Sequence, residues 1–206
     1  MTAISSHASA SVLNEIAIFS EPQKWLYLVP TVGAIALGCM FVPHFGVGLA
    51  LGAATLVAVT PLAIIQNVLG LTKEDPDNDY LKTLQMYPIF ATLVAPIAEE
   101  GLFRGLVQPL AVRAILFLAP AAAAAFFGTG FTAAAVIATA ATAALFGLAH
   151  AFNNHQNSYL QAINTTCSGI AFGLISVQFG LGACIAAHIM FNTIASLPMM
   201  AKRNDG

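Results

Sequence analysis

The sequence predicts an all-α fold, a polytopic membrane helical bundle with about six to seven transmembrane helices, from two observations. First, 58% of the 206 residues are hydrophobic and only 8% are charged, whereas a soluble domain carries about 25% charged residues. Second, the apolar residues fall into long runs, and a helix needs roughly 20 of them to cross a hydrocarbon core of about 30 Å. A multi-pass integral membrane protein is therefore expected.

The N-terminal part of the chain contributes a leader and two accessory spans. In residues 9–19 the apolar side chains recur at helical spacing, which is typical of a short interfacial helix. A frayed polar leader is the equal alternative for this segment. Residues 25–42 and 47–70 are apolar and are joined by the short turn VPHFG. The charged segment TKEDPDNDYLK, residues 72–82, is expected to lie in water.

The remaining spans follow in order along the chain. Residues 84–108 form an apolar run with two internal prolines, and residues 110–127, broken at Pro120, are expected to be a span or a re-entrant segment. The last three expected spans are 131–152, 158–178 and 181–200. Residues 131–145 are rich in alanine, which in a membrane predicts closely packed helices.

Charge and cysteine content exclude several classes of protein. The formal net charge is −2, so the chain has no basic field for nucleic acid. Cys39, Cys167 and Cys184 are scattered through apolar segments without a CxxC pair. They therefore predict neither a disulfide framework nor a zinc knuckle, and we expect all three to be small buried side chains.

Three formal charges stand in the middle of an apolar run, in the stretch IAEEGLFRGL. Ionisable residues in a membrane are costly, at about 2.5 to 3.5 kcal/mol for a central charge, and are usually functional. Glu100 and Arg104 are four residues apart with the acid first, so they can pair on one helix face. Glu99 is offset by about 100°. The spacing predicts that Glu100 is neutralised and that Glu99 stays free to work in a cavity.

Two later segments carry matching pairs of residues at the same four-residue spacing. Phe146 and His150 stand near the end of an Ala- and Gly-rich helix, and His188 and Asn192 stand in the last apolar segment. A single histidine on an apolar helix is more often a structural residue. Three such segments, each with a costly polar group, predict instead that these groups satisfy one another around a shared wet cavity.

These residues match three sequence motifs. EEGLFR (99–104) fits EExxxR, FGLAH (146–150) fits FxxxH, and HIMFN (188–192) fits HxxxN. In this order, each on a hydrophobic segment, they resemble the CPBP family of membrane proteins. That family groups type II CAAX prenyl endopeptidases with bacterial bacteriocin-processing and self-immunity (Abi) proteins. The resemblance covers about residues 84–200. It implies one membrane domain over 1–206, with 84–200 as the catalytic core and 1–83 as leader and accessory helices.

The resemblance implies an intramembrane endopeptidase of the glutamate type. By motif position, Glu99 is the general base that activates water, and Glu100 pairs with Arg104. His150 positions the water, while His188 and Asn192 stabilise the oxyanion. Phe146 supports the site, and no cofactor is implied. Such chemistry suits these residues, because a carboxylate can accept a proton from water and an amide donates a hydrogen bond without titrating.

A metal site is the main chemical alternative. Two histidines and a carboxylate, here Glu99, His150 and His188, are a common catalytic zinc set. Against zinc, no HExxH places two histidines on one helical turn.

Three functions remain open from the residues alone. The first is an endopeptidase that cuts a membrane-associated peptide or lipidated protein, with that substrate and the lipid bilayer as partners. The second is a non-catalytic binding or immunity protein that uses the same cavity, and the third is a proton-coupled transporter. A transporter more often shows two similar halves, which this sequence lacks. The short Ala-rich chain with compact loops favours a bacterial inner membrane.

Overall fold

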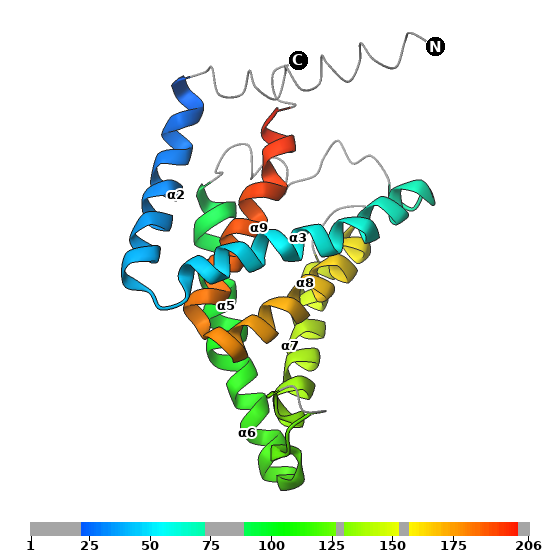
Figure 1. The fold of residues 1–206 in the computed structure, drawn as a ribbon. Coiled ribbons are helices and arrows are strands. Elements are labelled where there is room, and N and C mark those ends of the chain that lie inside the picture. The colour runs from blue at the N-terminus through cyan, green and yellow to red at the C-terminus, as the bar shows by residue number, and fades with distance from the viewer. Residues whose placement is uncertain (1–21, 73–88, 127–129, 153–156, 202–206) are drawn as a thin grey trace.

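The described part of the protein is all-α. The structure, a computed structural model, describes residues 22–72, 89–126, 130–152 and 157–201, with 22–31 and 198–201 as backbone only. The helices are α2 (Pro22–Phe41), α3 (Phe45–Val68), α5 (Ala95–Leu102), α6 (Gln108–Leu118), α7 (Ala133–Ala151), α8 (Ser158–Phe179) and α9 (Leu181–Ala201) (Figure 1). The expected leader helix and nearly all of the charged segment 72–82 lie outside the described residues.

Four helical stretches are long and apolar enough to cross a membrane by length and composition. They are Phe45–Val68, Phe90–Leu118, Ala133–Ala151 and Ser158–Phe179. Two further apolar stretches, Val32–Phe41 and Leu181–Leu197, are shorter. The predicted all-α class is therefore confirmed, whereas the predicted number of six to seven transmembrane helices is not.

The acidic pair lies on one helical stretch that extends from Phe90 to Leu118. The sequence predicted two elements here, with 110–127 as a separate span or a re-entrant segment, and that prediction is wrong. Instead, α6 continues the preceding helix and ends before Pro120, where the short 3-10 turn η4 (Pro120–Ala123) begins. Proline keeps the residue before it out of the helical region, and Ala119 has φ −141° and ψ 77°.

Two widened turns interrupt this long helix. The π-helical turns η2 (Phe90–Val94) and η3 (Phe103–Val107) each end two residues before a proline, Pro96 and Pro109 respectively. A proline has no N–H, and its ring clashes with the carbonyl four residues earlier. Widening the turn relieves that clash, so the two prolines account for both π turns. The acidic pair lies on α5, between them.

Small residues set how closely the helices approach. A Cβ on Gly48 or Gly52 of α3 would overlap the main chain of Ala183 or Ala187 of α9, so the two helices cross in direct backbone contact (Figure 1). The Ala-rich helix α7 completely buries Ala134, Ala138 and Ala143. The close packing predicted from the alanine content of this segment is therefore confirmed.

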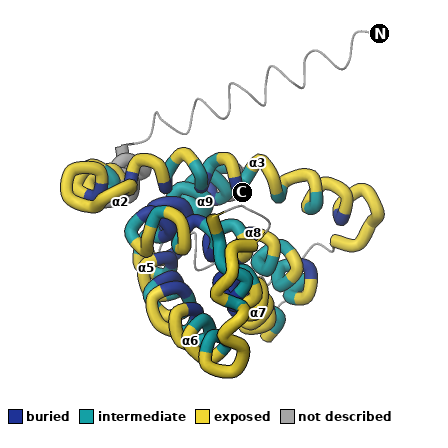
Figure 2. Tube along the Cα trace, turned by 60° about the horizontal axis from the view of Figure 1, so that its bottom comes forward, coloured by how far each residue is buried: buried dark blue, intermediate teal, exposed yellow. Residues whose placement is uncertain are grey.

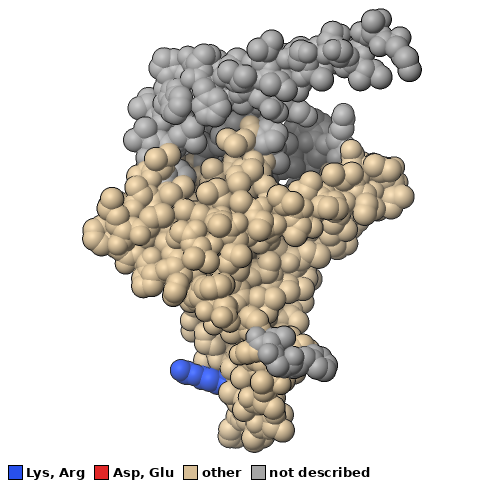
Figure 3. Space-filling model, in the orientation of Figure 1, with Lys and Arg blue, Asp and Glu red and all other residues tan. Residues whose placement is uncertain are grey.

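The outer surface of the described part of the chain is apolar and carries little charge. Buried positions follow the inward faces of the helices, and the outward faces are exposed (Figure 2). Figure 3 shows one face of the molecule, where the described residues present almost no charged atoms. Among the residues with described side chains, the formal charges are Glu99, Glu100, Arg104 and Arg113. Such a surface suits contact with lipid, and it leaves the acids of α5 as an exception that needs a chemical reason.

Candidate active site

The centre of the site is the carboxylate of Glu100, which is completely buried. Its Oε1 accepts hydrogen bonds from Arg104 Nη1 at 3.3 Å and from His188 Nδ1 at 2.7 Å. Its Oε2 accepts from Cys184 Sγ at 2.9 Å and lies 3.2 Å from Arg104 Nε. Both oxygens therefore face two polar partners each, which offsets the cost of burying the charge.

Arg104 is the counter-ion of this carboxylate and also ties α8 to the site. Its Nη2 donates to the carbonyl of Gly169 at 2.8 Å. Gly169 leaves room for this contact, because a Cβ there would lie 3.1 Å from Nη2. The guanidinium carbon also lies 4.6 Å from the centre of the Phe146 ring, within the range of a cation–π contact. Phe146, the phenylalanine of the FxxxH motif, thus packs against the Arg104 guanidinium.

Glu99 differs sharply from its neighbour. Its side chain is 32% exposed, and its Oε2 lies 3.8 Å from His188 Nε2. His188 therefore stands between the two acids, with Nδ1 against Glu100 and Nε2 facing Glu99. The His188 ring is stacked on Phe172 at 4.8 Å. The His188 imidazole thus lies between two different carboxylates. Both oxygens of Glu100 have polar partners, whereas Glu99 is accessible.

His150 reaches the same region from the end of α7. Its Nδ1 is 2.8 Å from the backbone oxygen of Phe146, and the two rings meet edge-on with centroids 4.8 Å apart. A carbonyl can only accept, so Nδ1 carries the proton and the neutral ring presents Nε2 as an acceptor. His150 is also close enough to Glu99 for an electrostatic interaction. This geometry suits a group that orients a water molecule.

Asn192 is engaged in a contact that the sequence did not predict. Its Nδ2 donates to the backbone oxygen of Ala91 at 3.0 Å. Ala91 belongs to η2, so this bond joins α9 to the widened turn before the acids. The side-chain amide has a second N–H, and the oxyanion role expected for Asn192 stays a prediction.

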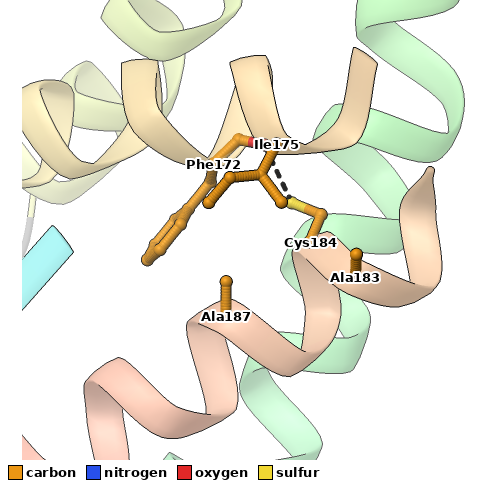
Figure 4. Close-up of a cluster of buried hydrophobic side chains, with 5 residues drawn as sticks. All are labelled: Phe172, Ile175, Ala183, Cys184 and Ala187. Atoms are coloured by element: carbon orange, nitrogen blue, oxygen red, sulfur yellow. Dashed lines mark hydrogen bonds between the residues drawn. The ribbon is translucent and has the colours of Figure 1, made fainter. Parts of the chain in front are cut away.

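Cys184 is a polar member of the site rather than only a packing residue. It lies completely buried on α9, in a cluster with Phe172, Ile175, Ala183 and Ala187 (Figure 4). Its thiol faces Glu100 Oε2 and, at 3.2 Å, the carbonyl of Phe172. The sequence predicted three buried cysteines, which is wrong for Cys39 and Cys167, because both are exposed. Their outward helix faces could not be identified without the packing.

Gln108 is the residue that the sequence reasoning missed. It lies four positions after Arg104, as Arg104 lies four after Glu100, and it is only 3% exposed. Its Nε2 donates to Thr139 Oγ1 at 3.1 Å and to the carbonyl of Gly173 at 3.2 Å. The four-residue spacing from Arg104 was the available signal. Gln108 fastens the acid-bearing helix to α7 and α8, one turn beyond Arg104.

The metal alternative finds no ready-made site. Among the described residues, no three His, Cys, Asp or Glu side chains are grouped so that they could hold a metal ion. Glu99, His150 and His188 therefore do not form a metal-binding cluster in this geometry.

Comparison with known proteins assigns the family. No curated protein and no solved structure matches the chain. A family model, Type II CAAX prenyl endopeptidase Rce1-like, matches residues 83–194. That range contains all three motifs. The chain therefore belongs to the Rce1-like type II CAAX prenyl endopeptidase family.

Proposed function

We propose that this protein is an intramembrane endopeptidase that hydrolyses a peptide bond of a membrane-associated peptide or lipidated protein, with Glu99 activating the water. The family is one of endopeptidases. The single observation that carries the mechanism is the difference between the adjacent acids. Glu100 has both oxygens occupied by Arg104, Cys184 and His188, whereas Glu99 is accessible.

The proposed reaction begins with a water held between two acceptors. Glu99 takes one proton from this water, and His150 Nε2 accepts a hydrogen bond from the remaining O–H, which directs an oxygen lone pair toward the scissile carbonyl. When the tetrahedral intermediate collapses, the C–N bond breaks and the protonated Glu99 gives its proton to the leaving amine. A positioned general base contributes about 10²–10⁴ in rate. Electrostatic interactions and hydrogen bonds of this kind are stronger in apolar surroundings than in water.

The oxyanion that forms needs N–H donors. His188 offers an N–H at Nε2 when its ring carries both protons, and its Nδ1–H is already committed to Glu100. The second N–H of the Asn192 amide is the other candidate donor. A single well-placed donor to an oxyanion is worth about 10²–10³ in kcat. Glu100 and Arg104 have an indirect role: Glu100, paired with Arg104, holds the His188 ring in place.

The test compares the two acids by conservative substitution. The purified protein in proteoliposomes is given a farnesylated CAAX peptide, and the products are measured by mass spectrometry. Glu99→Gln should lower cleavage by at least about 10² and leave the melting temperature in detergent unchanged. The matched change Glu100→Gln should lower both, because it removes the counter-ion of buried Arg104.

Undiminished cleavage by Glu99→Gln would refute the proposed mechanism. If the wild-type protein does not cleave the farnesylated probe, peptides from membranes with and without active Glu99 are compared to find another substrate. A protein that leaves both sets of peptides identical is not the proposed endopeptidase.

A further inference from the structure

The carbonyl of Ala91 has lost its partner within its own helix. In an α-helix it would accept from the N–H of Ala95, but in η2 that N–H bonds to Phe90 O. A widened turn would instead offer it the N–H of residue 96. Residue 96 is a proline and has no N–H. The π turn and the proline together leave this oxygen without a donor from the main chain.

Asn192 supplies the missing donor from another helix. Its Nδ2 lies 3.0 Å from Ala91 O, and Ala91 is only 5% exposed. A buried carbonyl without a partner carries a full desolvation penalty. The contact therefore closes a break in the backbone hydrogen bonding immediately before the acids.

The same helix, α9, holds the acid-bearing segment at two points. His188 contacts Glu100 beyond Pro96, and Asn192, one turn later on α9, contacts Ala91 before Pro96. The two contacts bracket Pro96, which has no N–H to donate within the helix.

We propose that Asn192 is a positioning residue, whose amide replaces the N–H that Pro96 lacks and thereby holds the Glu99–Glu100 segment against His188. The catalytic consequence rests on the proposed function. The hydrogen-bonding role does not, and it makes a separate prediction. An alanine at residue 96 restores an N–H to the helix, so the protein should then depend less on Asn192.

The chain contains a matched control for this idea. Pro109 follows η3 with the same spacing, and in that turn the N–H of Gln108 bonds to Phe103 O. The Asn192 amide is engaged at the first turn, with Ala91. A change at Pro109 should therefore leave the dependence on Asn192 intact.

The experiment is a double-mutant cycle between Asn192→Ala and Pro96→Ala, repeated with Pro109→Ala. Melting temperature in detergent and the kcat and KM for the farnesylated CAAX peptide in proteoliposomes are measured for each protein. Asn192→Ala should lower the melting temperature and kcat with little change in KM. In the Pro96→Ala background, the loss in kcat should be about ten-fold smaller, and the drop in melting temperature should also shrink. In the Pro109→Ala background both losses should keep their full size.

The outcomes separate the two ideas. Equal temperature drops for Asn192→Ala with proline or alanine at residue 96 would overturn the inference, whatever the activity. In a second outcome, Pro96→Ala reduces the drop in melting temperature caused by Asn192→Ala but leaves the fold loss in kcat unchanged. That result would overturn the positioning role and leave oxyanion donation as the catalytic role of Asn192. A wild-type protein without peptidase activity would refute the proposed function, while the thermal cycle still decides whether Asn192 closes the break at Pro96.

Discussion

His188 Nδ1 lies 2.7 Å from Oε1 of Glu100, a carboxylate with no exposed surface. Glu100 also contacts the guanidinium of Arg104, so its carboxylate acts as a hydrogen-bond acceptor. In the contact between Glu100 and His188, the imidazole Nδ1–H is therefore the donor. The ring therefore has a defined orientation, with Nε2 turned toward Glu99. Every catalytic role proposed for His188 depends on this relationship.

The first prediction concerns the protonation of His188. Nitrogen-15 spectra of the histidine-labelled protein should show His188 protonated at Nδ1, because Glu100 accepts that proton. Glu100→Ala should abolish the preference. His44, exposed in the turn before α3, is the internal reference and should show a mixture of tautomers. A His188 ring protonated only at Nε2 would contradict the arrangement.

The second prediction concerns the buried ion pair. Arg104→Ala should destabilise the protein by about 3–5 kcal/mol, because it leaves the Glu100 charge buried without its counter-ion. Arg113→Ala is the matched control, since Arg113 is an exposed arginine on the same long helix. Thermal unfolding in detergent measures both. An Arg104→Ala protein that melts like the wild type would show that the pair does not support the fold.

The third prediction concerns the crossing of α3 and α9. Gly48→Ala should destabilise the protein by about 1–3 kcal/mol, because the new Cβ overlaps the main chain of Ala183. Gly46→Ala, at a position with no atom within 4 Å of the added Cβ, should leave stability unchanged or slightly improved. Denaturation in mixed detergent micelles compares the two. Equal effects would mean that the backbones do not touch at Gly48.

The fourth prediction concerns metal dependence. Dialysis of the purified protein against a chelator should leave cleavage of the farnesylated peptide unchanged, because the proposed base is a carboxylate that acts on water directly. Activity that is lost on chelation and restored by zinc would replace the glutamate mechanism with the zinc alternative. Parallel dialysis without chelator controls for loss of lipid or detergent.

The sequence by itself determined the class of the fold and most helix limits. The predicted spans 47–70, 131–152, 158–178 and 181–200 agree with α3, α7, α8 and α9 within a few residues. It also determined which acid meets Arg104, since a four-residue spacing places both on one face of a helix. Hydrophobic periodicity and local spacing are properties of single segments, so they can be read without knowledge of packing.

Tertiary structure alone decided what surrounds those residues. Cys184 and His188 reach Glu100 across separations of 84 and 88 residues, and Asn192 meets a carbonyl that only the turn at Pro96 leaves open. The continuation of the acid-bearing helix through Pro109 to Leu118 likewise depends on how the chain widens before its prolines. The physical reason is that partners on different helices are chosen by helix rotation and crossing. Hydropathy does not encode these two features, because any rotation that buries the polar groups suits the same apolar pattern.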